Sequence, residues 1–163
     1  LMVVGMIIGT WIASGTVPDF LRHERGLRGR IQPMKGYSFT ADPGDLAPRL
    51  SITDVARKIV FCRLDGLVRV AGLAEFGARD ALPSAARSAL LVETARNALP
   101  QAADYERATG FWAGLRPATP NSLPIIERLS RRVTLNIGHG MLGWTYAMGA
   151  GERAAALVTE AVA

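Results

Sequence analysis

Cysteine is nearly absent from this sequence, and its scarcity excludes two kinds of structure. Cys62 is the single cysteine among 163 residues, so no disulfide can form within the chain, which is compatible with a reducing compartment. The sequence also lacks any cluster of cysteine and histidine that would offer the ligands of a zinc site. Because Cys62 lies in an apolar strand pattern, we expect a buried and unreactive thiol.

Long uninterrupted hydrophobic runs are missing as well. The uncharged segment 1–18 is of marginal length for a transmembrane helix and is broken by Gly5, Gly9 and Gly15. It also lacks the positively charged start of a signal peptide. We therefore expect a buried strand over residues 3–8 and a turn after it. The residue at position 1 is not methionine, which favours a natural N-terminus further upstream.

The charge pattern argues against nucleic acid as a partner. The formal net charge is +5 and the pI is near 10.1, but the basic residues are scattered along the chain. The one dense group, residues 22–30, contains an acid and no interleaved aromatic side chain, so it predicts a solvated basic loop. With 49% hydrophobic and 20% charged residues, the composition is that of a globular protein with one real core.

The most informative stretch of the chain is rich in glycine. Residues 136–145 read Asn-Ile-Gly-His-Gly-Met-Leu-Gly-Trp-Thr, between a short strand predicted over 133–137 and an Ala-rich helix predicted over 144–162. Such glycines let backbone amides approach a planar or anionic ligand at a helix N-terminus. The stretch predicts a cofactor seat, against the plainer alternative of an ordinary strand-to-helix turn. The residues of that seat are Gly138, His139, Gly140, Met141, Leu142, Gly143, Trp144 and Thr145.

A second informative segment, residues 114–120, carries a single arginine. Its sequence is Gly-Leu-Arg-Pro-Ala-Thr-Pro, and we expect Arg116 on a loop stiffened by the two prolines. A guanidinium pairs both oxygens of a carboxylate at once, which suits Arg116 to binding an acid. The alternative is a surface arginine or one in a salt bridge.

The remaining pattern predicts an α+β fold. A strand is expected over 31–40, before a Pro/Gly-rich connection. Two β-rich runs, 59–64 and 67–71, are joined by Asp65-Gly66, which predicts a hairpin with a type I′ turn. Helices are expected at 19–23 and 83–99. The second of these is amphipathic and ends at Pro100; its apolar stripe consists of Leu91, Val92, Ala95, Ala98 and Leu99.

Four segments in order resemble one family. They are residues 33–38 (Pro-Met-Lys-Gly-Tyr-Ser), 69–75 (Arg-Val-Ala-Gly-Leu-Ala-Glu), 111–117 and 138–145. The sequence from residue 31 onward resembles the C-terminal part of the small subunit of FAD-dependent D-amino acid dehydrogenases, in the D-amino acid oxidase-like flavoprotein group. The Gly-x-Gly-x-x-Gly fingerprint that holds the ADP half of FAD in that family does not occur in these 163 residues. The resemblance therefore implies a C-terminal fragment or a truncated relative.

The resemblance also implies that three parts of the chain belong to different domains of the complete enzyme. Residues 1–30 would be the end of one portion of the FAD-binding Rossmann-like domain. Residues 31–120 would form a substrate-binding region with an antiparallel or mixed sheet and packed helices. Residues 121–163 would return to the FAD-binding domain. The implied reaction is oxidative deamination of a D-amino acid, with hydride transfer from Cα to flavin N5.

The same resemblance implies roles for single residues. Arg116 would bind the substrate carboxylate. Lys35 and Tyr37 would line the flavin ring or the pocket, with packing in the fold and a position at the surface as the alternatives. His139 would be either a general base or a hydrogen-bonding part of its loop. Glu75 matches a family position without a mechanism. Two tryptophans, Trp112 and Trp144, would lie in the core or at the flavin edge.

The implied partners are FAD, a D-amino acid and an electron acceptor of the respiratory chain or a quinone. The implied location is cytoplasmic, with peripheral contact between the basic loop and the inner membrane. Two alternatives stay open. One is a glycine- or sarcosine-type amine oxidase, and the other is a non-catalytic interaction module with a decayed flavin site.

Overall fold

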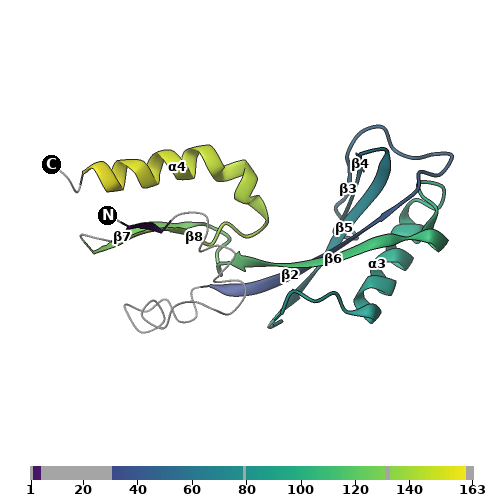
Figure 1. Ribbon diagram of the computed structural model, residues 1–163, viewed down its shortest axis with the longest axis horizontal. Helices are drawn as coiled ribbons and strands as arrows, with labels where there is room; N and C mark the ends of the chain where they lie inside the picture. The colour runs from purple at the N-terminus through teal and green to yellow at the C-terminus, as the bar shows by residue number, and fades with distance from the viewer. Residues whose placement is uncertain (1, 5–30, 79, 131–132, 161–163) are drawn as a thin grey trace. The chain divides into compact units, whose positions relative to one another are not determined.

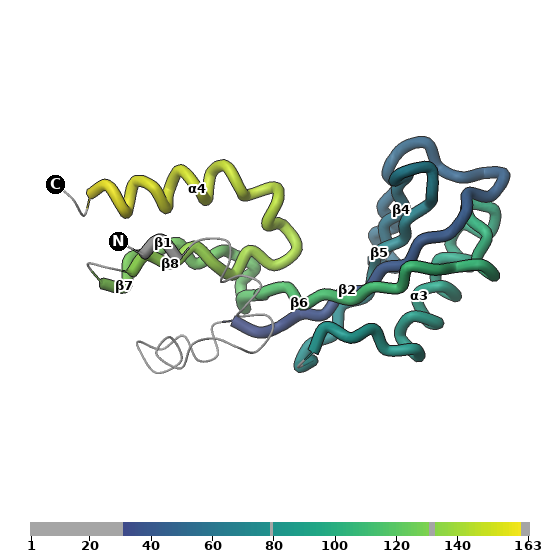
Figure 2. Tube along the Cα trace, in the orientation of Figure 1, coloured from purple at the N-terminus to yellow at the C-terminus, as the bar shows by residue number. Residues whose placement is uncertain are grey.

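The computed structural model describes residues 2–4, 31–78, 80–130 and 133–160, which form two compact units (Figures 1 and 2). Unit 1 comprises Leu1–Met34, Phe76–Asp80 and Leu115–Ala163, and unit 2 comprises Lys35–Glu75 and Ala81–Gly114. The division of the chain by sequence at residues 30 and 120 stays a prediction about the domains of a complete flavoprotein.

A five-stranded sheet and one helix make up unit 2. The strand order is β3 (Ile52–Asp54), β4 (Ile59–Leu64), β5 (Leu67–Phe76), β2 (Gln32–Ala41) and β6 (Thr109–Ala118). The first residues of β2 and the last of β5 and β6 belong to unit 1. Helix α3 (Ala85–Ala98) packs against this sheet (Figure 1), where its buried side chains join Phe39, Phe61 and Val70 in one core.

The β4–β5 hairpin follows directly from its two turn residues. Asp65 has a φ of 51° and Gly66 a φ of 82°, the pair of positive angles that a type I′ turn requires. Leu64 pairs with Leu67 across the turn, so the loop has two residues. The predicted hairpin and turn type are confirmed.

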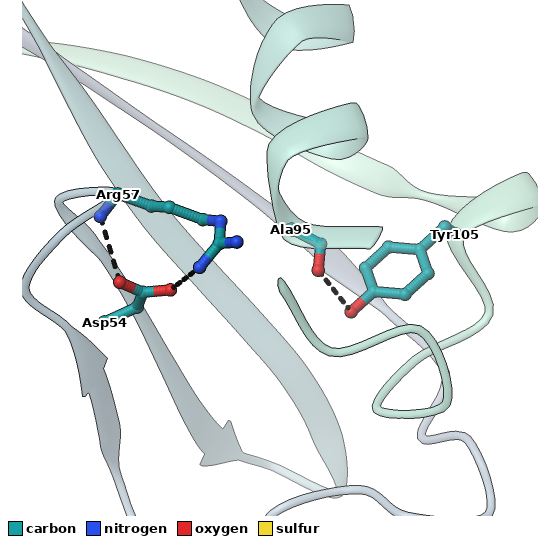
Figure 3. Close-up of polar contacts among 4 residues, drawn as sticks. All are labelled: Asp54, Arg57, Ala95 and Tyr105. Carbon is teal, nitrogen blue, oxygen red and sulfur yellow. Dashed lines mark hydrogen bonds and ion pairs between the residues drawn. The ribbon is translucent and has the colours of Figure 1, made fainter. Parts of the chain in front are cut away.

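Helix α3 buries the stripe that its sequence predicts. Leu91 and Ala95 are fully buried, while Val92, Ala98 and Leu99 are partly buried against the same core. Tyr105, from the short 3-10 helix η1 (Tyr105–Arg107), closes the C-terminal end of α3. Its hydroxyl donates to the carbonyl of Ala95 at 3.3 Å (Figure 3) and to that of Leu99 at 2.7 Å. Figure 3 also shows the β3–β4 turn, where the Asp54 carboxylate accepts from the backbone and side chain of Arg57.

Unit 1 is a smaller sheet with one long helix. Strand β8 (Val133–Ile137) pairs in parallel with β1 (Met2–Val4) and antiparallel with β7 (Ile125–Ser130). Helix α4 (Gly143–Thr159) runs along β7 and β8 (Figure 1). The α+β class is confirmed, and so are the strand leading into the glycine-rich stretch and the helix after it.

Several expectations differ from the structure. Arg116 lies on strand β6 and not on a loop, because β6 is an edge strand, where Pro117 can be accommodated without an N–H. Cys62 is half-buried, with its thiol 3.7 Å from the carbonyl oxygen of Arg69. Trp144 is 95% exposed, which excludes the core alternative for this residue, and its position at the flavin edge stays a prediction. Strand β1 covers the start of the strand expected over 3–8.

The rest of that strand, the helix expected over 19–23 and the basic loop over 22–30 lie outside the described residues. In the portion of the chain that the structure describes, no helix has the length and apolar character needed to span a membrane. The same portion contains no group of three metal-ligating side chains.

Candidate functional site

A cavity of about 490 Å³ in unit 1 brings the glycine-rich stretch together with three strand ends. The strand ends belong to the neighbouring strands β5, β2 and β6. The lining is mostly apolar with a few polar groups, as is usual in small-molecule sites. It consists of Gln32, Met34, Phe76, Ala118, Thr119, Pro120, Ser122, His139, Gly140, Met141 and Leu142.

Two glycines in the stretch have left-handed backbones for different reasons. The φ values are 81° at Gly138 and 54° at Gly140, a region that residues with a side chain rarely adopt. A Cβ on Gly138 would lie 2.6 Å from Cγ2 of Thr119, whereas nothing lies within 4 Å of one on Gly140. Gly138 therefore permits a close contact, and Gly140 leaves its backbone open toward the cavity that it lines.

The backbone after Gly140 forms the start of a helix. A 3-10 turn, η2 (Gly140–Leu142), leads into α4 at Gly143. Among the described residues, no side chain caps this end of α4, and its first turn holds no acid. The first amides of the helix consequently carry partial positive charge without an intrahelical partner. They can donate hydrogen bonds to a carbonyl oxygen or a negatively charged group of a ligand.

Arg116 lies next to this cavity along β6. It is two residues from Ala118, which lines the cavity, and alternation along a strand places both side chains on the same face. Arg116 is half-buried, and this burial lowers the pKa of its guanidinium below the usual value, yet the group is still a cation at neutral pH. Among the residues that the structure describes, its side chain has no hydrogen bond or ion pair.

His139 is the titratable group in the cavity wall. It is half-buried, and burial lowers the pKa of its imidazole below the ordinary 6.5. The ring is therefore neutral at pH 7 and offers one donor and one acceptor. Its backbone carbonyl accepts from the amide of Leu142 at 3.0 Å and so helps to shape the turn.

Lys35 and Tyr37 do not line this cavity. Both lie in unit 2, where the fully buried Tyr37 hydroxyl donates to Oε2 of Glu75 at 2.6 Å. The Lys35 Nζ lies 5.6 Å from the centre of the Tyr37 ring. Burial, reinforced by the hydrogen bond to Glu75, raises the pKa of Tyr37. Glu75, for which sequence reasoning finds no role, is thus the partner of a buried tyrosine.

The structure brings together only part of the predicted site. His139, Gly140, Met141 and Leu142 line the cavity, and Gly138 lies directly before them. Gly143, Trp144 and Thr145 form the first turn of α4.

Sequence reasoning missed Gln32, Met34, Phe76 and Ser122 as lining residues. Ser122 lies in an Asn-Ser pair typical of turns. The other three depend on the order of the strands, which no local pattern reveals.

Comparison with known proteins gives one family. A sequence model described as "FAD dependent oxidoreductase" (DAO) matches residues 9–157. The D-amino acid dehydrogenase of Paramagnetospirillum magneticum is 42% identical over 151 residues, which are 91% of this chain and 36% of that protein. D-amino acid dehydrogenase 2 of Pseudomonas aeruginosa is 43% identical over 130 residues, which are 78% of this chain and 31% of that protein. The chain spans about a third of the length of these relatives.

A solved structure supports the same fold. L-proline dehydrogenase from P. horikoshii superposes with a TM-score of 0.70 on 93% of this chain and 41% of its own, at 18% identity. At that identity the likeness concerns the fold alone.

Proposed function

Because the chain belongs to the DAO family of FAD-dependent oxidoreductases, we propose that it supplies the substrate anchor and part of the flavin seat of a D-amino acid dehydrogenase. The 163 residues then form the C-terminal part of a longer enzyme. The similarity to two D-amino acid dehydrogenases over most of this chain supports this assignment of substrate class.

The observation that carries the proposal is the charge of Arg116, which no side chain in the described part of the structure pairs. A half-buried cation loses hydration and is costly unless an opposite charge compensates it. The described part of the chain offers Arg116 no such partner, so a carboxylate from a ligand is the natural one. In an amino acid this carboxylate is attached to Cα, the same carbon that carries the amine and loses the hydride.

The glycine-rich stretch fits an isoalloxazine ring. The open space around Gly140 lets a flat ring approach the backbone, and the uncapped start of α4 points partial positive charge at whatever binds there. A flavin bound there would carry negative charge near N1 and the C2 carbonyl oxygen once it is reduced. Backbone amides of residues 140–145 would stabilise that charge.

In this scheme the protein orients the substrate and stabilises the charge that develops during the reaction. FAD, when bound, accepts the hydride from the substrate Cα at N5. Arg116 holds the carboxylate with two parallel hydrogen bonds, which fixes the direction of the Cα–H bond. The neutral imidazole of His139 offers one donor and one acceptor in the cavity wall, while the substrate ammonium loses its proton to solvent before transfer.

The electron acceptor and location form part of the same proposal. We infer that the electrons leave to a quinone or another respiratory-chain acceptor, with the enzyme in the cytoplasm and in peripheral contact with the inner membrane. Reduction of a soluble quinone analogue by D-alanine, together with recovery of the activity from washed membranes by salt, tests this part.

The test of the proposed function uses the full-length, FAD-loaded polypeptide that carries these residues. We expect D-alanine to bleach the flavin absorbance under anaerobic conditions, and turnover in air to yield little hydrogen peroxide. Stoichiometric peroxide would favour an amine oxidase of the glycine or sarcosine type. A protein without flavin would favour the interaction module.

A further inference from the structure

Thr119 contacts both walls of the cavity with different branches of its side chain. It is 8% exposed and directly follows the last residue of β6. Its hydroxyl donates to the carbonyl of Leu123 at 2.8 Å. Its methyl carbon Cγ2 lies 2.6 Å from the position that a Cβ on Gly138 would take, so the methyl packs against that glycine.

The hydroxyl branch helps to close the turn 119–123. The Ser122 amide donates to the Thr119 carbonyl at 3.2 Å, and the Leu123 amide donates to Oδ1 of Asn121 at 3.1 Å. Ser122 has a φ of 59°, which is unfavourable for a residue with a side chain and needs support from its surroundings. The Thr119 hydroxyl gives part of that support, and Ser122 lines the cavity.

The methyl branch acts on the opposite wall. Gly138 has a φ of 81° and begins the stretch whose next residues, 139–142, line the cavity. Because the methyl fills the place of the missing side chain, Gly138 cannot move toward β6. Ile125 faces the same position at 3.7–3.9 Å, so the Thr119 methyl is the nearest of the groups that confine the glycine-rich backbone where it leaves β8.

We propose that Thr119 is a positioning residue that sets both walls of the site, its hydroxyl holding the turn 119–123 and its methyl holding the glycine-rich stretch. The inference rests on the proposed function where it concerns turnover. In that function the first wall lies beside the Arg116 strand and serves the substrate. The second wall serves the flavin.

Two substitutions separate the branches. Thr119→Val keeps a methyl against Gly138 and loses the hydroxyl, whereas Thr119→Ser keeps the hydroxyl and loses the methyl. In the FAD-loaded full-length enzyme we expect Thr119→Val to raise KM for D-alanine about tenfold with the flavin spectrum unchanged. We expect Thr119→Ser to shift the flavin absorbance bands and lower flavin occupancy, with KM within about twofold of the parent.

A matched control comes from α4. The Thr159 hydroxyl also donates to backbone carbonyls, those of Ala155 and Ala156, but its residue does not line the cavity. Thr159→Val should leave KM and the flavin spectrum unchanged. If Thr119 had only a structural role, both variants would lower the fraction of active enzyme to the same extent. The KM and the flavin spectrum of the enzyme that stays active would then be unaltered.

Amide hydrogen exchange on the FAD-loaded full-length enzyme without substrate supplies a readout that does not depend on catalysis. Exchange should accelerate at residues 122–123 in Thr119→Val and at residues 138–140 in Thr119→Ser. Failure of D-alanine to reduce the parent flavin would count against the proposed function only. Equal effects of the two variants, or exchange unchanged in both, would overturn the positioning role of Thr119.

Discussion

The Tyr105 hydroxyl donates a hydrogen bond of 2.7 Å to the carbonyl oxygen of Leu99, at the point where α3 ends. The same hydroxyl also reaches the carbonyl of Ala95 at 3.3 Å. Tyr105 is 6% exposed, so removing the hydroxyl deletes a buried hydrogen bond. The two carbonyls keep backbone donors, since the Leu99 amide donates to Ala95 at 2.9 Å and the Ala102 amide donates to Leu99 at 3.1 Å. Tyr105→Phe should lower the free energy of unfolding by about 0.5–1.5 kcal/mol, the net contribution of one hydrogen bond, as measured by urea denaturation.

The same tyrosine makes stability depend on alkaline pH. Burial raises the pKa of Tyr105 from 10.0 to about 12, although the nearby Arg96 opposes the rise. The folded state then holds its proton more tightly than the unfolded state, so the contribution is complete below pH 10 and is lost as pH rises through 12. The gap in unfolding free energy between the parent and Tyr105→Phe should shrink over this range. A gap that stays constant would refute the assignment.

His139 should titrate in the opposite sense. Its pKa lies below 6.5 because burial disfavours the imidazolium, so the folded state binds this proton less readily than the unfolded state. The neutral ring contributes stability above pH 6.5, and this contribution is lost as pH falls through the lower folded value. NMR titration of the imidazole, assigned with His139→Gln, should give a midpoint below that of a histidine in a model peptide. A higher midpoint would mean that an acid partners the ring.

Gly140 should tolerate no side chain although space surrounds it. Gly140→Val forces a branched residue to a φ of 54° and places bulk where a ring would lie, so we expect loss of bound flavin with the fold largely retained. Gly149→Val is the control, because Gly149 has equally open surroundings within α4 and no positive φ. Flavin absorbance and circular dichroism of both variants measure the difference. Retention of flavin by Gly140→Val would remove the stretch from the cofactor seat.

The 163 residues by themselves should bind FAD weakly or not at all. They contain no Gly-x-Gly-x-x-Gly sequence to receive the pyrophosphate, and the glycine-rich stretch contacts only the ring end of the cofactor in the proposed scheme. Isothermal titration of FAD into this chain checks the expectation. Submicromolar affinity would contradict it.

Sequence patterns predict the elements whose signals are local. The Asp65-Gly66 pair determines a turn through its own backbone angles, and the stripe on α3 repeats within one helix. The sequence does not predict strand β6, because Gly110, Gly114 and Pro117 are residues that usually indicate loops. The structure accommodates them: β6 is an edge strand, and the Trp112 ring occupies the space beside Gly114 that a side chain would need.

In the site, too, features of single residues can be predicted from the sequence, whereas contacts between distant residues cannot. The glycines at 138 and 140 predict a special backbone because positive φ is a property of single residues. Met34 and Phe76 line the same cavity as that backbone because β2 and β5 are neighbours in the sheet. The sequence alone does not show which strands are neighbours. The contact between Thr119 and Gly138 is likewise visible only once the chain is folded.

The carboxylate anchor is the central claim, and the most direct test is steady-state turnover of D-alanine, with an artificial electron acceptor, by the FAD-loaded full-length enzyme carrying Arg116→Lys. Lysine keeps the charge but loses the paired planar hydrogen bonds, a loss of about 2–4 kcal/mol in the transition state. Reduction of the acceptor by D-alanine should show kcat/KM lowered by roughly 30- to 1,000-fold, with flavin content unchanged. Arg128→Lys, at an exposed position on β7, should match the parent. A near-normal kcat/KM for Arg116→Lys, or a parallel loss of flavin, would contradict the account.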